Sequence, residues 1–459
     1  MAGGCTHIIV AGGGASGVLL ACHLLREGGE GVRVTLIEKR ASVGLGTAYS
    51  TSHPRHLLNV RASNMSAFAD DPSHFQRWLT KETGLVESDE AAAMVFAPRN
   101  VYGRYISSLI DTFDPDRVRL ETVHGEVTSI VAEPAGVKVQ TASGKTMKGD
   151  VAVLATGFSE TGHDDATIHS PWSQPAAAGL APDASVLILG TGLTMVDLVI
   201  ELRSSGHTGP IYAMSRRGLL SQTHCASVPL NLAHASVPYG KSILQLWRWL
   251  RRLCEDEVDV GRDWRGAIDG IRPFTAELWR QLPLESKRRF LRHARPWWDI
   301  HRHRMAPAIS AEIASAIAWD HLQILAAKVL SIKADRGKAI VHFRRRGQEK
   351  TQTIEVARVF PCMGVSTNPA MSKSTAIQSL VRQGLARADE LGLGLDIAEN
   401  CALRDVNGEA SQQLFAVGPI TRGAYWEMIA VPDIRLQCAK LAHEIIRRSK
   451  LRASLPLAS

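Results

Sequence analysis

The first residues with an evident chemical use form a glycine-rich segment near the N-terminus. Its G-x-G-x-x-G pattern includes Gly12, Gly14, Ala15, Ser16 and Gly17. Glycines at this spacing let a backbone turn approach the pyrophosphate of a dinucleotide, and the N-terminus of the helix that follows attracts the negative charge. The segment therefore predicts a dinucleotide-binding turn.

The same pattern returns 178 residues later without a gap. Gly12 and Gly14 correspond to Gly190 and Gly192, and the third glycine position is Met195. Because that third glycine normally lets the helix pack closely against its strand, we expect a somewhat wider second turn. Two copies of one unit predict two bound dinucleotides, and they arise by chance far less readily than one copy.

The residues after the second strand of each unit favour different nucleotides. Glu38 and Lys39 follow the apolar strand of the first unit, and Arg216 and Arg217 stand at the corresponding place in the second. An acid accepts hydrogen bonds from ribose hydroxyls, whereas arginine neutralises a 2′-phosphate. The first unit thus suits FAD or NAD and the second suits NADPH, unless the arginines are ordinary solvated charges.

The elements that must position these residues follow one order twice. Each unit has an apolar strand, a glycine turn, a helix and a second strand, and an alternating β-meander follows it. The meanders occupy 125–155 and 325–360, and they close at Thr156-Gly157 and near Gly364. Strands that alternate with helices predict a parallel sheet. We therefore expect an α/β protein with two Rossmann-like dinucleotide-binding domains.

Composition separates a third region from both units. Seven of the ten tryptophans lie between 225 and 320, and 15 basic against 9 acidic residues give +6 of the chain's net +8 between 241 and 304. Apolar residues at helical spacing predict a helical insert, with tryptophans in its core and arginines on its surface. Since no nucleic-acid recognition fold is visible, we expect no nucleic-acid partner. The expected domains are an FAD domain at 1–181 and 365–459, an NAD(P)H domain at 182–224 and 321–364, and the insert at 225–320.

Other classes of protein are disfavoured. Seven cysteines without a C-x-x-C pair oppose a disulfide framework, a structural zinc site and a dithiol redox centre. His301 and His303 lack carboxylate partners, so we expect no metal. The longest candidate for a membrane span, 8–22, has 15 residues and four glycines, and no signal peptide is recognisable. We expect a cytoplasmic protein without a membrane partner.

Additional motifs carry a resemblance to a known family. They include Gly44-Leu45-Gly46-Thr47-Ala48-Tyr49, His56-Leu57-Leu58-Asn59-Val60, Asn64-Met65-Ser66-Ala67, Pro98-Arg99, Gly190-Thr191-Gly192-Leu193-Thr194-Met195-Val196-Asp197, Ser215-Arg216-Arg217-Gly218 and Gly418-Pro419. With them, the chain resembles bacterial FAD/NAD(P)-binding proteins related to the flavin-dependent N-hydroxylating monooxygenases. That resemblance implies two dinucleotide domains arranged as in glutathione reductase, with FAD on the first and NADPH on the second.

The resemblance also implies roles for single residues. Arg99 would meet the FAD pyrophosphate, the backbone of Val127 would meet the adenine, and Glu38 and Lys39 would flank the adenosine. The implied flavin-side residues are Gly46, His56, Leu58, Asn59, Asn64 and Met65. The resemblance further implies cofactor contacts at the ends of strands, from Thr156, Gly157, Gly364 and Gly418. His56, Asn59 and Asn64 could equally cap turns in a loop.

The reaction implied by the resemblance is flavin-dependent oxidation. NADPH would reduce FAD, O₂ would add as a C4a-(hydro)peroxide, and one oxygen would pass to a small molecule, with N-hydroxylation favoured. Asn59 and Arg304 are the candidate catalytic residues, and Arg302, His303 and Arg304 could meet an anionic substrate or NADPH. The substrate would be an amine or an anion. A reductase without oxygen insertion, or a flavin-binding sensor or interaction protein, stays open.

Overall fold

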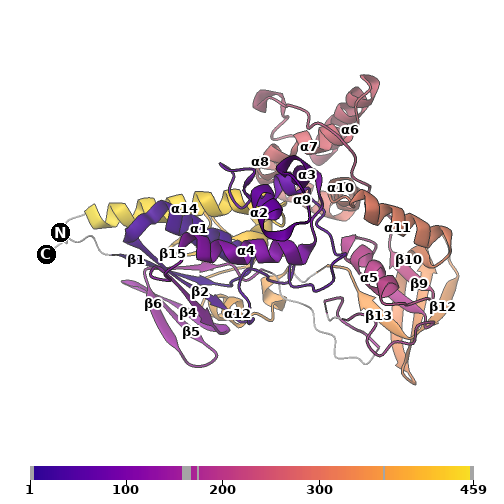
Figure 1. The fold of residues 1–459 in the computed structure, drawn as a ribbon, viewed down its shortest axis with the longest axis horizontal. Helices are drawn as coiled ribbons and strands as arrows, with labels where there is room; N and C mark the ends of the chain where they lie inside the picture. Colours follow the sequence, from indigo (N-terminus) through magenta and orange to yellow (C-terminus); the bar gives the residue numbers. More distant parts are fainter. Residues whose placement is uncertain (1–4, 158–166, 173–174, 365–366, 455–459) are drawn as a thin grey trace.

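Two six-stranded β-sheets form the frame of the protein (Figure 1). The computed structural model describes residues 5–157, 167–172, 175–364 and 367–454. A three-stranded sheet lies beside the first six-stranded sheet, and a group of helices stands above the region between the two large sheets in Figure 1. The expected α/β class is confirmed.

The first sheet contains the first glycine turn. Its strand order is β14-β15-β7-β1-β2-β3, and only β14 runs antiparallel to its neighbour. The strands are β1 (Thr6–Ala11), β2 (Val32–Glu38), β3 (Leu120–His124), β7 (Val151–Leu154), β14 (Ala402–Arg404) and β15 (Ala410–Ala416). Their near-continuous apolar runs are typical of parallel strands that are covered on both faces.

Helices cover one face of this sheet and a small sheet covers the other. On the first face lie α1 (Ala15–Gly28), α4 (Arg99–Phe113) and the long C-terminal helix α14 (Val431–Ser454), with α2 (His74–Thr83) and α3 (Asp89–Met94) packed nearby. On the second face lie α12 (Thr375–Arg382) and the strands β4 (Val127–Glu133), β5 (Gly136–Thr141) and β6 (Thr146–Gly149). Each face buries its own apolar core.

The second sheet repeats this plan. Its order is β12-β11-β10-β9-β8-β13, and α5 (Leu193–Ser204) and α11 (Pro307–Ala318) pack on one face. The strands are β8 (Val186–Leu189), β9 (Ile211–Ser215), β10 (Leu322–Asp335), β11 (Lys338–Arg345), β12 (Thr351–Val356) and β13 (Arg358–Pro361). The repeat of a βαβ unit followed by a meander is therefore present in the structure.

The two meanders attach to their sheets differently. In the first half, Gly125 and Glu126 interrupt the strand structure between β3 and β4. The strands β4, β5 and β6 therefore form a separate sheet. In the second half, β10 is continuous: Leu322–Ala326 pairs with β9 in parallel, and the strand then pairs with β11 in antiparallel register. The second meander thereby joins the main sheet.

The insert is helical, as its periodicity predicts. Its helices are α6 (Ile243–Asp259), α7 (Arg265–Gly270), α8 (Thr275–Gln281), α9 (Leu284–Arg289) and α10 (Arg295–Arg302), and a short helix α13 (Arg422–Tyr425) of the C-terminal region contacts α8. Trp279 and Trp298 are buried in its core. Trp297 and Trp319 are 38% and 74% exposed, so the prediction that the tryptophans pack the core is wrong for these two.

Candidate functional site

The first glycine turn is shaped by close backbone contacts. Gly12 has φ +110°, and a Cβ there would lie 2.6 Å from the carbonyl carbon and oxygen of Ala155. A Cβ on Gly17 would lie 2.0 Å from the Gly12 oxygen. Glycine is therefore required at both positions. No side chain of a described residue caps the N-terminus of α1, because its N-cap is Gly14, and the nearest neighbour of a Cβ there would be Gly46 at 3.4 Å.

Predicted phosphate-side residues that are distant in sequence meet at this helix end. Gly418 has φ +77°, and a Cβ there would lie 2.4 Å from Ser16 Oγ. The Gly418 amide donates to Gln437 Oε1 at 2.8 Å, which fixes the approach. Thr156 Oγ1 is buried and has no hydrogen-bond partner among the described residues. The glycine cradle and this unsatisfied hydroxyl fit a dinucleotide pyrophosphate.

The predicted adenosine-side residues surround the end of β2. The Glu38 carboxylate is buried and accepts from the Gly13 amide at 2.7 Å and from the Arg40 amide at 2.9 Å. Lys39 is exposed. The Val127 carbonyl accepts from Thr375 Oγ1 at 2.7 Å. A carboxylate has about four acceptor positions, so Glu38 keeps capacity for ribose hydroxyls.

The second glycine turn has nearly the same backbone conformation as the first. Gly190 has φ +116°, and a Cβ there would lie 2.4 Å from the Cys362 oxygen. The N-cap Gly192 has φ −86° and ψ −169°, against −70° and −172° at Gly14. None of the described residues lies within 4 Å of a Cβ on Gly192. The second unit therefore offers the same open helix N-terminus.

Met195 changes how the second helix begins. The Gly192 carbonyl accepts from Met195 N at 3.0 Å and from Val196 N at 3.3 Å, whereas the Gly14 carbonyl accepts from Val18 N at 3.0 Å. The Met195 side chain is fully buried in the core that α5 and α11 form against the second sheet. The glycines of the two turns share one backbone conformation, so they give no sign of the wider second turn that the sequence predicts, and the two helices differ instead in their first hydrogen bonds.

An exposed arginine follows β9, the second strand of the second unit. Arg216 is exposed at the end of β9, and Arg217 donates to the His293 carbonyl at 3.4 Å. Ser215 Oγ accepts from Thr191 Oγ1 at 3.0 Å and from Gly218 N at 2.9 Å, which holds the strand end against the glycine turn. A 2′-phosphate of a nucleotide in this turn would meet Arg216.

Gly364 and Gly157 close corresponding strands in the two halves. Gly157 follows β7 with φ +64°, and Gly364 follows β13 with φ +93°. Both lie just beyond the residues that the glycine turns approach, namely Ala155 and Cys362. The repeat therefore extends to these two glycines.

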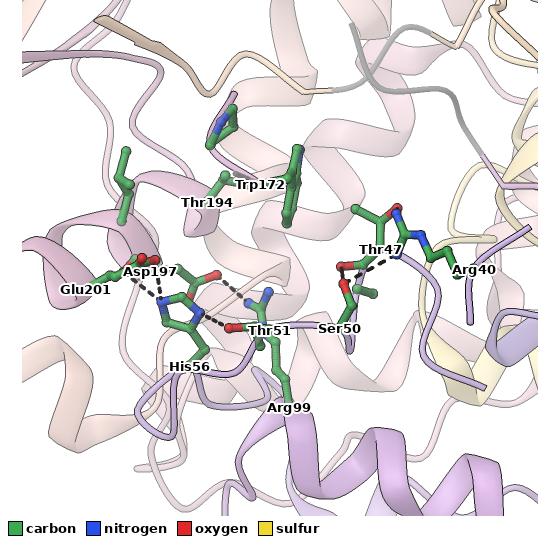
Figure 2. A pocket seen from close by; sticks show the side chains of 13 residues that line it. Arg40, Thr47, Ser50, Thr51, His56, Arg99, Trp172, Thr194, Asp197 and Glu201 are labelled. Carbon is green, nitrogen blue, oxygen red and sulfur yellow. Dashed lines mark hydrogen bonds and ion pairs between the residues drawn. The ribbon is translucent and has the colours of Figure 1, made fainter. Parts of the chain in front are cut away.

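A cavity of about 80 Å³, open to solvent, lies where α5 meets the segments at 40–56 and 99 (Figure 2). Its lining consists of Arg40, Thr47, Ala48, Ser50, Thr51, His56, Arg99, Pro171, Trp172, Thr194, Asp197, Leu198 and Glu201. Thr47 follows Gly46 beside the first turn, and Thr194 lies in the first turn of α5. The cavity therefore lies close to both glycine turns.

An ion pair between Arg99 and Asp197 crosses this cavity (Figure 2). The Arg99 guanidinium lies 2.8 Å from Asp197 Oδ2, and both side chains are 17% exposed. Burial raises the pKa of Asp197 to about 6, and the charge of Arg99 opposes that rise. Arg99, expected at the pyrophosphate, is held here by Asp197 and by the Leu57 carbonyl, to which its Nε donates at 3.2 Å.

His56 makes a second connection between the same elements. Its Nε2 lies 3.1 Å from the Asp197 carbonyl, which can only accept, so this nitrogen carries the proton. Its Nδ1 then accepts from Thr51 Oγ1 at 2.7 Å. Burial, reinforced by the Arg99 charge, lowers the pKa of His56 to about 4. The ring is therefore neutral at neutral pH, although Glu201 Oε2 lies 3.7 Å from Nε2.

The other predicted flavin-side residues occupy the loop that follows His56. Leu58 and Met65 are buried, whereas Asn64 is exposed and ends a short 3₁₀ turn. The Leu58 amide donates to the Ala97 carbonyl at 2.9 Å, and Tyr102 Oη donates to the Met65 carbonyl at 2.9 Å. The loop is thus fixed to α4 and to the segment before it.

The two candidate catalytic residues are connected through His224. The Asn59 carbonyl accepts from His224 Nε2 at 2.9 Å, and the His224 amide donates to the Met305 carbonyl, next to Arg304. Arg304 is 2% exposed and pairs with Asp269. Neither Asn59 nor Arg304 lines the cavity in Figure 2.

Glu201 lines the cavity but was not predicted from the sequence, and Asp197 was part of a predicted motif without a role of its own. They stand four residues apart in α5, whose other residues between 195 and 202 are apolar. Positions four apart lie on one helix face. Two acids on one face of an otherwise apolar helix were the available signal.

Comparison with known proteins supports the fold. Residues 9–159 match the model of a family described as FAD-NAD(P)-binding. No curated protein sequence matches the chain. Among the described residues, no group of three or more His, Cys, Asp and Glu could hold a metal ion, and no helix is long and apolar enough to cross a membrane.

Solved structures of low sequence identity share the whole architecture. Ornithine hydroxylase from Pseudomonas aeruginosa in its reduced form has a TM-score of 0.67 and 12% identity, over 96% of this chain and 99% of that one. Ornithine N-hydroxylase from Kutzneria sp. 744 has a TM-score of 0.65 and 13% identity, over 97% of this chain and 99% of that one. L-lysine 6-monooxygenase from Pseudomonas syringae has a TM-score of 0.65 and 15% identity, over 97% of this chain and 99% of that one. The chain therefore has the fold of the two-domain flavoproteins, as the sequence motifs implied.

Proposed function

We propose that this protein is an FAD-dependent, NADPH-using monooxygenase that hydroxylates the nitrogen of a small amine. The observation that carries the proposal is the pair of glycine turns with one conformation, Gly12 at φ +110° and Gly190 at φ +116°, on either side of one cavity. Two dinucleotides bound at these turns can bring their reactive rings together there.

The structural relatives support the choice of chemistry. The similar structures are an ornithine hydroxylase, an ornithine N-hydroxylase with reduced FAD, NADP⁺ and L-ornithine, and a lysine monooxygenase. We accordingly assign FAD to the domain of 1–181 and 365–459 and NADPH to that of 182–224 and 321–364. O₂ and a small amine are the proposed co-substrates. All seven cysteines are unpaired, which supports a reducing, cytoplasmic setting.

The chain's own residues bind and orient in this proposal. The turn at Gly12 and Gly14 holds the FAD pyrophosphate, Glu38 takes the ribose hydroxyls, and Arg216 takes the 2′-phosphate of NADPH. Bound FAD would supply hydride acceptance and oxygen activation. Because His56 is neutral and Arg99 is paired with Asp197, the cavity floor presents fixed hydrogen-bonding groups with little net charge.

Rapid mixing tests oxygen transfer against simple reduction. The FAD-loaded protein is reduced with NADPH, mixed with oxygenated buffer, and monitored separately for O₂ uptake and H₂O₂ release. A lag between uptake and release is expected, because a monooxygenase retains the oxygen until substrate arrives. Simultaneous uptake and release would refute oxygen transfer and favour a reductase. Failure of NADPH to reduce the flavin would refute both.

A further inference from the structure

Arg304 is a buried cation with unused hydrogen-bonding capacity. Its side chain is 2% exposed and contacts Asp269 through one terminal nitrogen. Its Nε and its other terminal nitrogen have no hydrogen-bond partner among the described residues. Donors of a charged group are rarely left unsatisfied in a protein interior, because water no longer compensates them. These two donors are therefore available to an acceptor that enters the site.

The surroundings of Arg304 carry an excess of positive charge. Arg265 is neutralised by Asp263, to whose two oxygens one of its nitrogens lies at 3.1 and 3.0 Å. Arg304 forms an ion pair with Asp269, whose side chain is 24% exposed. Arg61 donates to the Cys225 carbonyl at 2.9 Å, and its buried Nε has no hydrogen-bond partner in the part of the chain that the structure describes. Three cations thus face two acids, so one negative charge would complete the group.

The backbone brings this group against the loop expected beside the flavin. Thr223 forms a parallel bridge with Met305, and the Met305 amide donates to the Gln222 carbonyl at 2.8 Å. His224, which follows Thr223 in the first of these segments, donates through Nε2 to the Asn59 carbonyl. Because Nε2 is the protonated nitrogen, Nδ1 of the neutral ring is an acceptor. Donors for an anion and an acceptor for an N–H therefore lie around one junction.

We propose that Arg304, assisted by Arg61, binds an anionic group carried by the substrate, such as a carboxylate, at the junction of the insert with the loop at 57–66. The proposal rests on the proposed function, since it names the class of amine that the enzyme oxidises: an amine with a negative charge elsewhere in the molecule. Arginine suits this task because its planar donors match a carboxylate in bidentate geometry. It also gives the basic insert a specific use.

Calorimetric titration with acetate and acetamide tests the site without catalysis. The two probes are nearly isosteric and differ in charge, and both are titrated into the FAD-loaded protein at constant ionic strength. Saturable binding of acetate, at least about tenfold tighter than acetamide, is expected. Arg304→Met should abolish the difference, and the matched control Arg346→Met, at an exposed position, should keep it.

A second variant guards against a folding defect. Arg304→Met leaves Asp269 without its partner, so the double variant Arg304→Met/Asp269→Asn is titrated too, with FAD content as the check of integrity. Equal binding of the two probes in the parent protein, or acetate binding that survives in both Arg304 variants, overturns the proposal. A shifted flavin spectrum in these variants without any acetate binding in the parent also overturns it, and assigns Arg304 to the flavin.

The same preparations separate this inference from the proposed function. Reduction of the flavin by NADPH is measured on each. Selective acetate binding in a protein that NADPH cannot reduce would retain the anion site and refute the oxygenase function. Normal reduction without selective acetate binding would retain the function and refute the site.

Discussion

His56 shows how a single side chain can report on the contact between two domains. It lies in the loop after β2, yet it bonds the backbone of α5 and lies near Glu201. Its neutral ring is stabilised by a fixed tautomer, with a donor and an acceptor each matched to one partner. A protonated ring would lose the bond from Thr51 and meet the charge of Arg99. The contact is therefore sensitive to acid.

Replacing His56 with Gln should flatten the acid side of the stability profile. The pKa of His56 falls from 6.5 to about 4 on folding, so its contribution is fully present above pH 6.5 and is lost as the pH falls towards 4. The difference corresponds to roughly 3 kcal/mol. Unfolding free energies at pH 6.5 and 4 should therefore differ more in the parent protein than in His56→Gln.

The control for that experiment is His321→Gln, at an exposed position. It should follow the parent protein. Asp197 acts in the opposite direction, because its pKa is raised to about 6 and stability from this group falls as the pH rises from 3.8. Asp197 is unchanged in His56→Gln, so its contribution remains in both proteins. Identical profiles for the parent and His56→Gln would contradict the prediction.

Arg216 should decide the choice between NADPH and NADH. The residue is exposed at the end of β9, where a 2′-phosphate would meet it. Arg216→Ala should raise the KM for NADPH by about tenfold or more, equivalent to about 1.4 kcal/mol, and leave the KM for NADH nearly unchanged. Flavin reduction assays with both nucleotides measure this. Exposed Arg346 supplies the control substitution. Equal effects on both nucleotides would refute the assignment.

At the scale of elements, the sequence predicted what is determined locally. The strand, turn and helix at 6–28 form because an apolar run, glycines and a helix-forming segment follow one another. The repeat then located the second unit. By contrast, the continuity of β10 depends on pairing with β9 and later with β11, and no local signal specifies both partners. The contact of His56 with α5 has the same origin, since 141 residues separate His56 from Asp197.

Substitutions at the third glycine position of the motif should have different effects in the two turns. A Cβ at Gly17 would lie 2.0 Å from the Gly12 oxygen, so Gly17→Ala should displace α1 and abolish FAD retention. Met195 occupies the corresponding position in α5, so Met195→Ala should cost about 2–4 kcal/mol through a cavity and change NADP⁺ affinity little. FAD content, nucleotide titration and unfolding measure these effects. Full FAD retention in Gly17→Ala would contradict the first prediction.

At the scale of the whole molecule, two ion pairs connect the predicted FAD domain with α5 and α11, the helices that cover the second sheet. Arg99 and Asp197 are each 17% exposed and meet in the cavity of Figure 2. Arg55 and Glu312 pair at the surface, with side chains 46% and 39% exposed. Only the first pair is sheltered from water and salt. Only it should therefore influence how the two domains hold the space between the glycine turns.

A double-mutant cycle distinguishes the two pairs. Arg99→Met leaves the Asp197 carboxylate unpaired at a site where both side chains are only 17% exposed, and Asp197→Asn leaves the guanidinium unpaired, so each single variant should be destabilised and reduced more slowly by NADPH. Combining them removes both charges, and the double variant should recover part of the loss, with a coupling of roughly 1–3 kcal/mol. The equivalent cycle on Arg55 and Glu312 should give less than about 1 kcal/mol, because solvent screens that pair. Equal coupling in both cycles would show that the buried pair does not control the contact between the domains.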